Sequence, residues 1–116
     1  MRRKIIAGNW KMNGDAALVR AIAAHATDAI SGAELVVCPP YTLLAAAASH
    51  LPAGVGLGAQ DVSEYEAGAY TGEVAAAMLL EVGCRYVIVG HSERRSLYGE
   101  DSSRVAAKYS AAREAG

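Results

Sequence analysis

Short apolar runs alternate along the chain with longer segments whose apolar residues recur at helical spacing. The runs predict β-strands at residues 4–7, 35–38, 55–59 and 86–89. The segments between and after them predict helices over residues 13–32, 42–49, 71–83 and 100–116, with Gly32, Gly83 and Gly116 as expected C-cap glycines. The run at 86–89 is mostly apolar, which is typical of a strand buried on both faces of a parallel sheet.

This order of elements predicts an α/β fold. Strands that alternate with helices form parallel sheets, and right-handed crossovers bring the carboxyl ends of all strands to one rim. A chain of 116 residues is long enough for one core only. Four such strands leave the first and the last as bare edges, which something must cover.

Composition excludes several classes of partner. The net charge is -1 and no long basic run is present, so we expect neither nucleic acid nor an anionic membrane surface to bind. The basic start at residues 1–4 is followed by an apolar run too short for a signal peptide or a membrane span, which predicts a cytoplasmic protein. Cys38 and Cys84 lack the spacing of a metal site and are expected to be reduced, partly buried thiols.

Polar residues follow three of the predicted strands. Asn9 and Lys11 come after the first strand, Gln60 after the third and His91 after the fourth. Ligands of α/β sheets bind beyond the carboxyl ends of the strands, so we expect these side chains to converge, with Lys11 available to an anion. Each has a plainer interpretation when taken alone: Lys11 as a surface residue of a turn, and His91 as the cap of one.

One long irregular connection spans residues 62–70. Loops of this length in a compact domain are usually functional, and two tyrosines on it favour a surface that docks onto a partner. A flexible excursion without function is the alternative.

The sequence also carries motifs that resemble a known family. Residues 8–13 (GNWKMN), 59–61 (AQD), 68–73 (GAYTGE) and 89–95 (VGHSERR) are similar, in order and spacing, to those of the triosephosphate isomerase family. The family's fold is the TIM (β/α)8 barrel. Residues 1–116 resemble its amino-terminal half, four parallel βα units of a single barrel domain, with the carboxyl-terminal half absent.

The resemblance implies a reaction and roles for individual residues. The family interconverts dihydroxyacetone phosphate and glyceraldehyde 3-phosphate through an enediolate, in glycolysis and gluconeogenesis, without a cofactor or a metal. Lys11 and Asn9 would bind the substrate, and His91 would donate a hydrogen bond to its carbonyl. Supporting residues would be Glu93, Ser92 and Gln60. The helix predicted to begin at Ser92 has a positive end that disfavours a charged imidazole.

The resemblance also implies contacts between chains and an incomplete site. The loop at 62–73, with Tyr70 and Thr71, would contact a second subunit of a homodimer. In the family, the glutamate base and the segments that bind the phosphate follow later strands. Glu73, Glu93 and Glu100 are not part of the sequence motif that carries this base. We therefore expect this chain to be inactive alone and to need a complementary carboxyl-terminal half. Two alternatives are a self-associating half-barrel scaffold and another phosphate-handling barrel enzyme.

Overall fold

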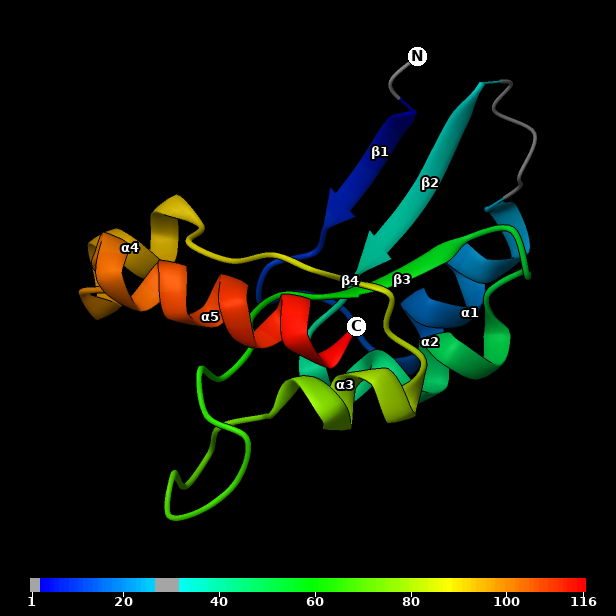
Figure 1. Ribbon diagram of the computed structural model, residues 1–116. Helices are drawn as coiled ribbons and strands as arrows, with labels where there is room; N and C mark the ends of the chain where they lie inside the picture. The colour runs from blue at the N-terminus through cyan, green and yellow to red at the C-terminus, as the bar shows by residue number, and fades with distance from the viewer. Residues whose placement is uncertain (1–2, 27–31) are drawn as a thin grey trace.

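A computed structural model describes residues 3–26 and 32–116 of the chain, drawn in Figure 1. The elements, in order, are β1 (Lys4–Asn9), α1 (Ala16–His25), β2 (Ala33–Cys38), the 3-10 helix η1 (Tyr41–Leu43), α2 (Leu44–His50), β3 (Gly56–Ala59), α3 (Ala76–Val82), β4 (Tyr86–Val87), α4 (Ser92–Tyr98) and α5 (Ser102–Ala115).

The four strands form one parallel sheet in the order β1-β2-β3-β4. The longest pairing joins β1 to β2 over six residues, from Lys4 opposite Ala33 to Asn9 opposite Cys38. The pairings of β2 with β3 and of β3 with β4 are shorter and also parallel. All carboxyl ends therefore meet at one edge of the sheet, as the alternation of elements predicts.

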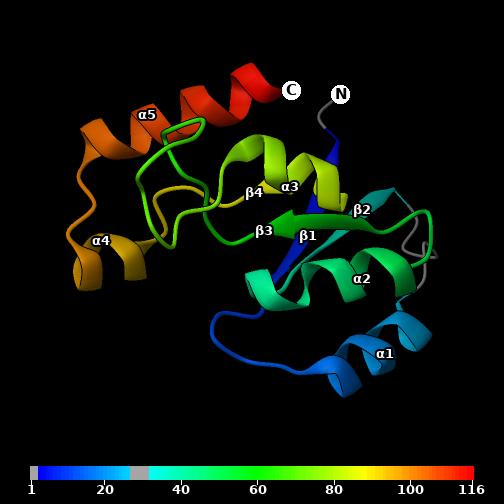
Figure 2. The same cartoon turned by 90° about the horizontal axis from the view of Figure 1, so that it is seen from below.

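The helices α1, α2, α3 and α5 pack in that order beside the sheet, and α4 lies to one side (Figure 2). Asp15 caps α1 by accepting a hydrogen bond from the Leu18 N–H, while α1 packs on α2, α2 on α3 and α3 on α5. Apolar side chains from α1, α2, α3 and β3, and from the connections after β3 and α3, form the core. Its buried members are Val19, Leu44, Ala47, Leu57, Ala59, Val62, Leu79 and Cys84.

The two outer strands are poorly covered. The β1 strand is exposed along most of its length, with Ile5 and Ile6 each 48% exposed, and Figure 1 shows β1 and β2 extending beyond the helices. The prediction of a strand buried on both faces at residues 86–89 is wrong, because only Tyr86 and Val87 form β4 and both are half-buried. Among the described strands β4 has β3 as its one neighbour, so its other edge lacks a partner.

Two helix boundaries also differ from the predicted ones. The helix α1 ends at His25 with Ala26 as its cap, so Gly32 does not cap it, and residues 27–31 of the predicted span lie outside the described residues. The helix α3 begins at Ala76 rather than near Thr71, because the carbonyl of Val74 instead accepts the Ser63 N–H at 2.9 Å. Its end at Gly83 is as predicted.

Both thiols are free and deeply buried. Cys38 and Cys84 are 2% and 3% exposed, and burial raises the pKa of each thiol to about 11. They are therefore packing residues that are protonated near neutral pH. Over the described part of the chain, none of the helices is long and apolar enough to cross a membrane.

Candidate active site

A pocket of about 430 Å³ opens at the carboxyl edge of the sheet. It is lined by side chains that follow β1, β3 and β4, and by α4. The predicted site residues among them are Asn9, Lys11, Gln60, His91 and Glu93. The apolar part of the lining comes from Met12, Pro40, Leu97 and the ring of Tyr41, and Tyr98 also contributes.

Lys11 is held in an unusual backbone conformation. Its φ of 56° lies in the left-handed region, which costs free energy for a residue with a side chain and persists only where surrounding contacts offset that cost. Asn9 at the end of β1 accepts the Lys11 N–H through Oδ1 at 2.9 Å. Gln60 holds the following peptide unit, since Nε2 donates to the Lys11 carbonyl and to the Cys38 carbonyl, each at 2.9 Å. The ends of β1, β2 and β3 together fix this lysine.

The Lys11 ammonium forms an ion pair at the pocket. Its Nζ lies 2.6 Å from Oε1 of Glu93, and the two side chains are 54% and 42% exposed. The hydrogen bond from Lys11 holds the pKa of the Glu93 carboxyl below its usual value. Because the pair stays open to solvent, the ammonium can still approach an incoming anion.

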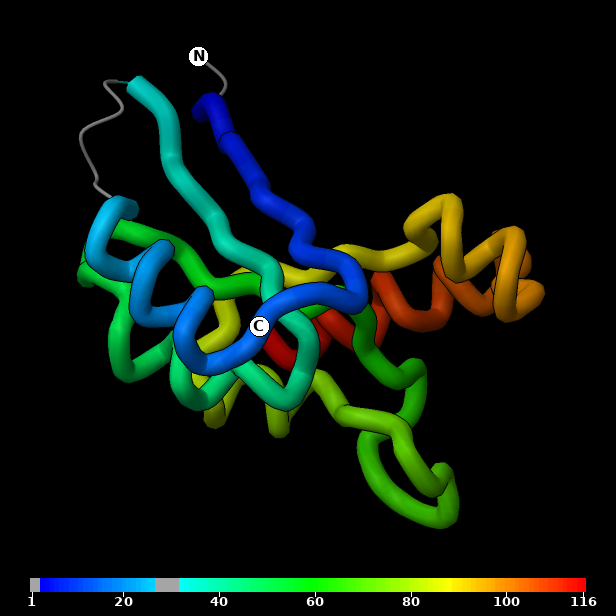
Figure 3. Tube along the Cα trace, turned by 180° about the vertical axis from the view of Figure 1, so that it is seen from behind, coloured from blue at the N-terminus to red at the C-terminus, as the bar shows by residue number. Residues whose placement is uncertain are grey.

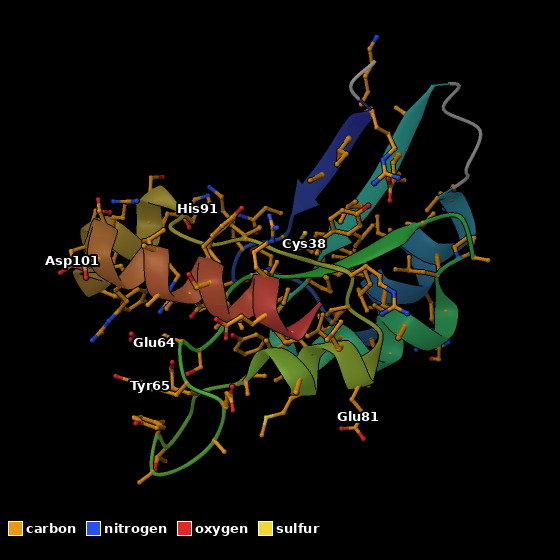
Figure 4. All side chains as sticks on the ribbon, viewed as in Figure 1. Cys38, Glu64, Tyr65, Glu81, His91 and Asp101 are labelled. Carbon is orange, nitrogen blue, oxygen red and sulfur yellow. The ribbon has the colours of Figure 1, made fainter. Side chains whose placement is uncertain are left out.

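His91 is presented by the turn between β4 and α4. Gly90 adopts a φ of 65°, and a side chain there would lie 2.7 Å from Val105, so the close turn suits glycine. His91 then caps α4, and its Nδ1 accepts the Glu93 N–H at 3.1 Å. An accepting Nδ1 carries no proton, which leaves Nε2–H as the donor. Figure 4 labels His91 beside the start of α4.

A buried ionic cluster borders the pocket, and two of its members, Asp61 and Arg94, belong to the pocket lining. Lys108 of α5, 3% exposed, donates to Asp61 Oδ1 at 2.9 Å and to Glu100 Oε2 at 2.6 Å. Arg94 of α4 donates to the same Glu100 oxygen at 2.6 Å and lies 3.3 Å from Asp61. Burial alone would raise the pKa of Glu100, but hydrogen bonds from Lys108 and Arg94 hold it below its usual value. This cluster ties α4 and α5 to the end of β3.

Comparison with known proteins places the chain in a family. The family model described as triosephosphate isomerase matches residues 4–116. The chain belongs to the triosephosphate isomerase family. It is 76% identical over 116 residues to triosephosphate isomerase of Halorhodospira halophila, covering all of this chain and 47% of that protein. It is 54% identical over 115 residues to the Alcanivorax borkumensis protein of the same name, covering 99% of this chain and 47% of the relative.

A solved structure supports the same assignment. The crystal structure of triosephosphate isomerase from Bartonella henselae matches with a TM-score of 0.88 and 44% identity, over 99% of this chain and 49% of that chain. The predicted fold class, parallel βα units forming half of a TIM barrel, is confirmed. The chain spans about half the length of the triosephosphate isomerase relatives it matches.

Not every residue expected from the triosephosphate isomerase resemblance lies at this pocket. Ser92 is exposed in the first turn of α4 and is not part of the lining. Tyr70 and Thr71 lie on the 62–73 loop and line a separate hollow against α4 and α5. Of the segment expected to contact a partner, Val62 and Ser63 are instead buried in the chain's own interior.

Sequence reasoning missed the ionic cluster altogether. Lys108 is separated from Asp61 by 47 residues, so no local spacing connects them. The spacing of Glu100 and Lys108 gave only a weak signal, since eight residues place two side chains about 80° apart around a helix and Glu100 precedes α5. Among residues 3–26 and 32–116, no group of three or more His, Cys, Asp or Glu side chains could hold a metal ion.

Proposed function

We propose that this chain supplies the lysine and histidine side of a triosephosphate isomerase active site, in a cytoplasmic enzyme of glycolysis and gluconeogenesis. The reaction interconverts dihydroxyacetone phosphate and glyceraldehyde 3-phosphate by proton transfer through an enediolate. The observation that carries the proposal is the junction of Asn9, Lys11 and His91 at one pocket, with Lys11 fixed in a left-handed conformation.

Each residue has a role that its contacts support. The Lys11 ammonium attracts the anionic substrate and offsets negative charge as the enediolate forms. The Nε2–H of His91 donates to the substrate carbonyl, because Nδ1 is occupied by the Glu93 N–H. Asn9 holds the Lys11 N–H and keeps its own amide nitrogen for a substrate oxygen. The chemistry requires no cofactor.

The pocket lacks a free base in the described part of the chain. Its lining carboxylates are Asp61 and Glu93, and both are already ion-paired, with Lys108 and Arg94 and with Lys11 respectively. A positioned general base contributes about 10²–10⁴-fold to turnover. We therefore propose that the chain alone is inactive and that a complementary carboxyl-terminal half supplies the glutamate base and the residues that bind the phosphate.

A complementation assay tests this proposal. The purified chain is assayed for isomerase activity by enzyme coupling, alone and mixed with a chain that supplies strands five to eight. We expect activity only in the mixture, and its loss when His91→Gln replaces the wild-type chain. If the mixture with His91→Gln stays active, His91 has no role in the reaction. If the wild-type mixture shows no activity, the proposal is refuted.

The exposed loop is proposed as a contact with a second copy in a homodimer. Tyr70 and Thr71 are exposed at its carboxyl-terminal limb, and the loop projects from the body in Figure 3. A tip of this shape fits a recess on another subunit, such as the neighbourhood of Asn9 and Glu93. Thr71→Arg should weaken dimerisation more than core stability; an unchanged dimer dissociation constant would refute the assignment.

The second candidate is a self-associating half-barrel scaffold without catalysis. Exposed Ile5 and Ile6 on β1 favour it, because an edge strand with apolar side chains attracts another edge. In that case Ile5→Lys would dissociate the assembly in sedimentation experiments, and the complementary half would not restore activity.

A further inference from the structure

The 62–73 loop is anchored at its root and exposed at its tip. The Ser63 N–H donates to the Val74 carbonyl at 2.9 Å, and Ser63 Oγ accepts the Tyr65 N–H at 3.1 Å. Residues 65–73 are all exposed. A segment with so few contacts to the body would ordinarily sample many conformations, and each ordered residue costs conformational entropy.

Two aromatic rings connect the limbs of this loop. The ring centroids of Tyr65 and Tyr70 are 3.8 Å apart and their planes differ by 4°. Each tyrosine is only 42% exposed although neither enters the core, because the rings cover one another. The four residues between them, 66–69, are thereby closed into a short arch.

The backbone of the arch fits the stacked rings. Gly68 has a φ of 122°, and its carbonyl accepts the Tyr70 N–H at 2.9 Å. A side chain at Gly68 would meet the Tyr70 ring at 3.3 Å, so the ring lies directly against the turn. The Tyr70 carbonyl accepts the Glu73 N–H at 3.0 Å, which continues the same ordered segment past Thr71.

A charged contact supports the amino-terminal limb. Glu64 Oε1 lies 3.2 Å from Arg104 Nε of α5, and Figure 4 labels Glu64 and Tyr65 on the loop beside that helix. This pair holds the amino-terminal limb to the body, and the aromatic stack joins Tyr70 of the carboxyl-terminal limb to Tyr65 of the amino-terminal limb.

We propose that the Tyr65–Tyr70 stack holds the 62–73 loop in its docking shape before a second copy of the chain binds. Tyr65 is then a positioning residue for the interface: it orders Tyr70 and Thr71 and need not touch the partner. Ordering the loop in the free chain removes that entropic cost from association. This inference rests on the proposed dimer contact.

The test compares Tyr65→Ala with Tyr65→Phe, which keeps a stacking ring. The first readout is cleavage of the chain by a glutamyl endopeptidase after Glu66, inside the arch. Cleavage after Glu81, exposed on α3, serves as an internal reference for overall folding. An aromatic pair is worth a factor of about 2 to 12 beyond the area that it buries, so Tyr65→Ala should accelerate cleavage after Glu66 by about fivefold. Tyr65→Phe should match the wild type, and cleavage after Glu81 should not change.

The second readout is the dimer dissociation constant from sedimentation. Because each dimer contains two such loops, Tyr65→Ala should raise that constant by about 25-fold, the square of the single-loop effect. Unchanged cleavage after Glu66 overturns the inference. Faster cleavage with an unchanged dissociation constant also overturns it, and Thr71→Arg then distinguishes the causes. If Thr71→Arg weakens the dimer, only the role of the stack is wrong; if it does not, the proposed contact is wrong as well.

Discussion

Lys11 and Lys108 each place Nζ 2.6 Å from a glutamate oxygen, yet the two ion pairs lie in opposite environments. The side chains of Lys11 and Glu93 are 54% and 42% exposed, whereas those of Lys108 and Glu100 are 4% and 3% exposed. Lys11 and Glu93 line the pocket, whereas Lys108 and Glu100 do not. The distance between Nζ and the carboxylate oxygen therefore does not show which lysine is able to bind a ligand.

Solvent decides what each pair can do. Water screens the Lys11–Glu93 attraction, so the ammonium can exchange Glu93 for another anion at small cost. Lys108 cannot exchange its partners in this way, because moving away from Asp61 and Glu100 would leave unpaired charges in the interior. The open pair suits chemistry, and the closed cluster fixes α4, which carries His91 and Glu93 at its start.

The largest expected effect is on stability, from breaking the closed cluster. Lys108→Met leaves two buried carboxylates without their ammonium, and should lower the free energy of unfolding by about 3–5 kcal/mol. Urea denaturation followed by circular dichroism measures the loss. Lys11→Met is the matched control and should barely move the midpoint. Equal midpoints for the two variants would contradict the prediction that the buried ion pair stabilises the fold more than the exposed one.

The next effect is on turnover, from removing the open lysine. In enzyme reconstituted with the complementary half, Lys11→Ala should lower turnover by about 10²–10³-fold, because a preorganised charge next to the developing enediolate is lost. The coupled assay measures it, with the urea midpoint as the check on folding. Turnover within a factor of about two of wild type would exclude Lys11 from transition-state stabilisation.

A smaller effect is the pH dependence of stability contributed by Glu100. The pKa of Glu100 in the folded chain is held below the usual value. Its contribution to the free energy of unfolding is therefore complete above the unfolded pKa of about 4.3 and is lost as the pH falls through the folded pKa. Glu100→Gln should cost about 1–3 kcal/mol at neutral pH. The gap from wild type should close in acid, as measured by urea denaturation from neutral pH downward. A gap independent of pH would mean that the loss comes from packing.

The smallest effect is the response of the open pair to salt. The pKa of Glu93 lies below its ordinary value because of the hydrogen bond from Lys11. Adding NaCl to about 0.5 M should raise it towards that value, since exposed charges are screened. Carbon-13 NMR titration of the carboxyl groups follows this, with Glu100 as the reference that should respond less. Equal salt responses would contradict the contrast in exposure.

Local sequence pattern predicted the sheet and the residues that gather at its edge, but not the buried ionic cluster. Asn9, Lys11, Gln60 and His91 could be expected to meet because each follows a strand, and parallel strands end together. The conformation of Lys11 was not predictable, because it depends on Gln60, 49 residues away. The length of β4 was overestimated, since apolar residues at 88–89 favour a strand only where a neighbour on each side is available.

The two buried cysteines make the chain a convenient object for chemical labelling. Thiol reagents react with the thiolate, and burial both shields Cys38 and Cys84 and raises the pKa of each to about 11. A single cysteine introduced at an exposed position, such as Glu66 on the arch, would therefore be the fast-reacting thiol of the folded protein. A fluorophore attached there would report the position of the loop without removal of either natural cysteine.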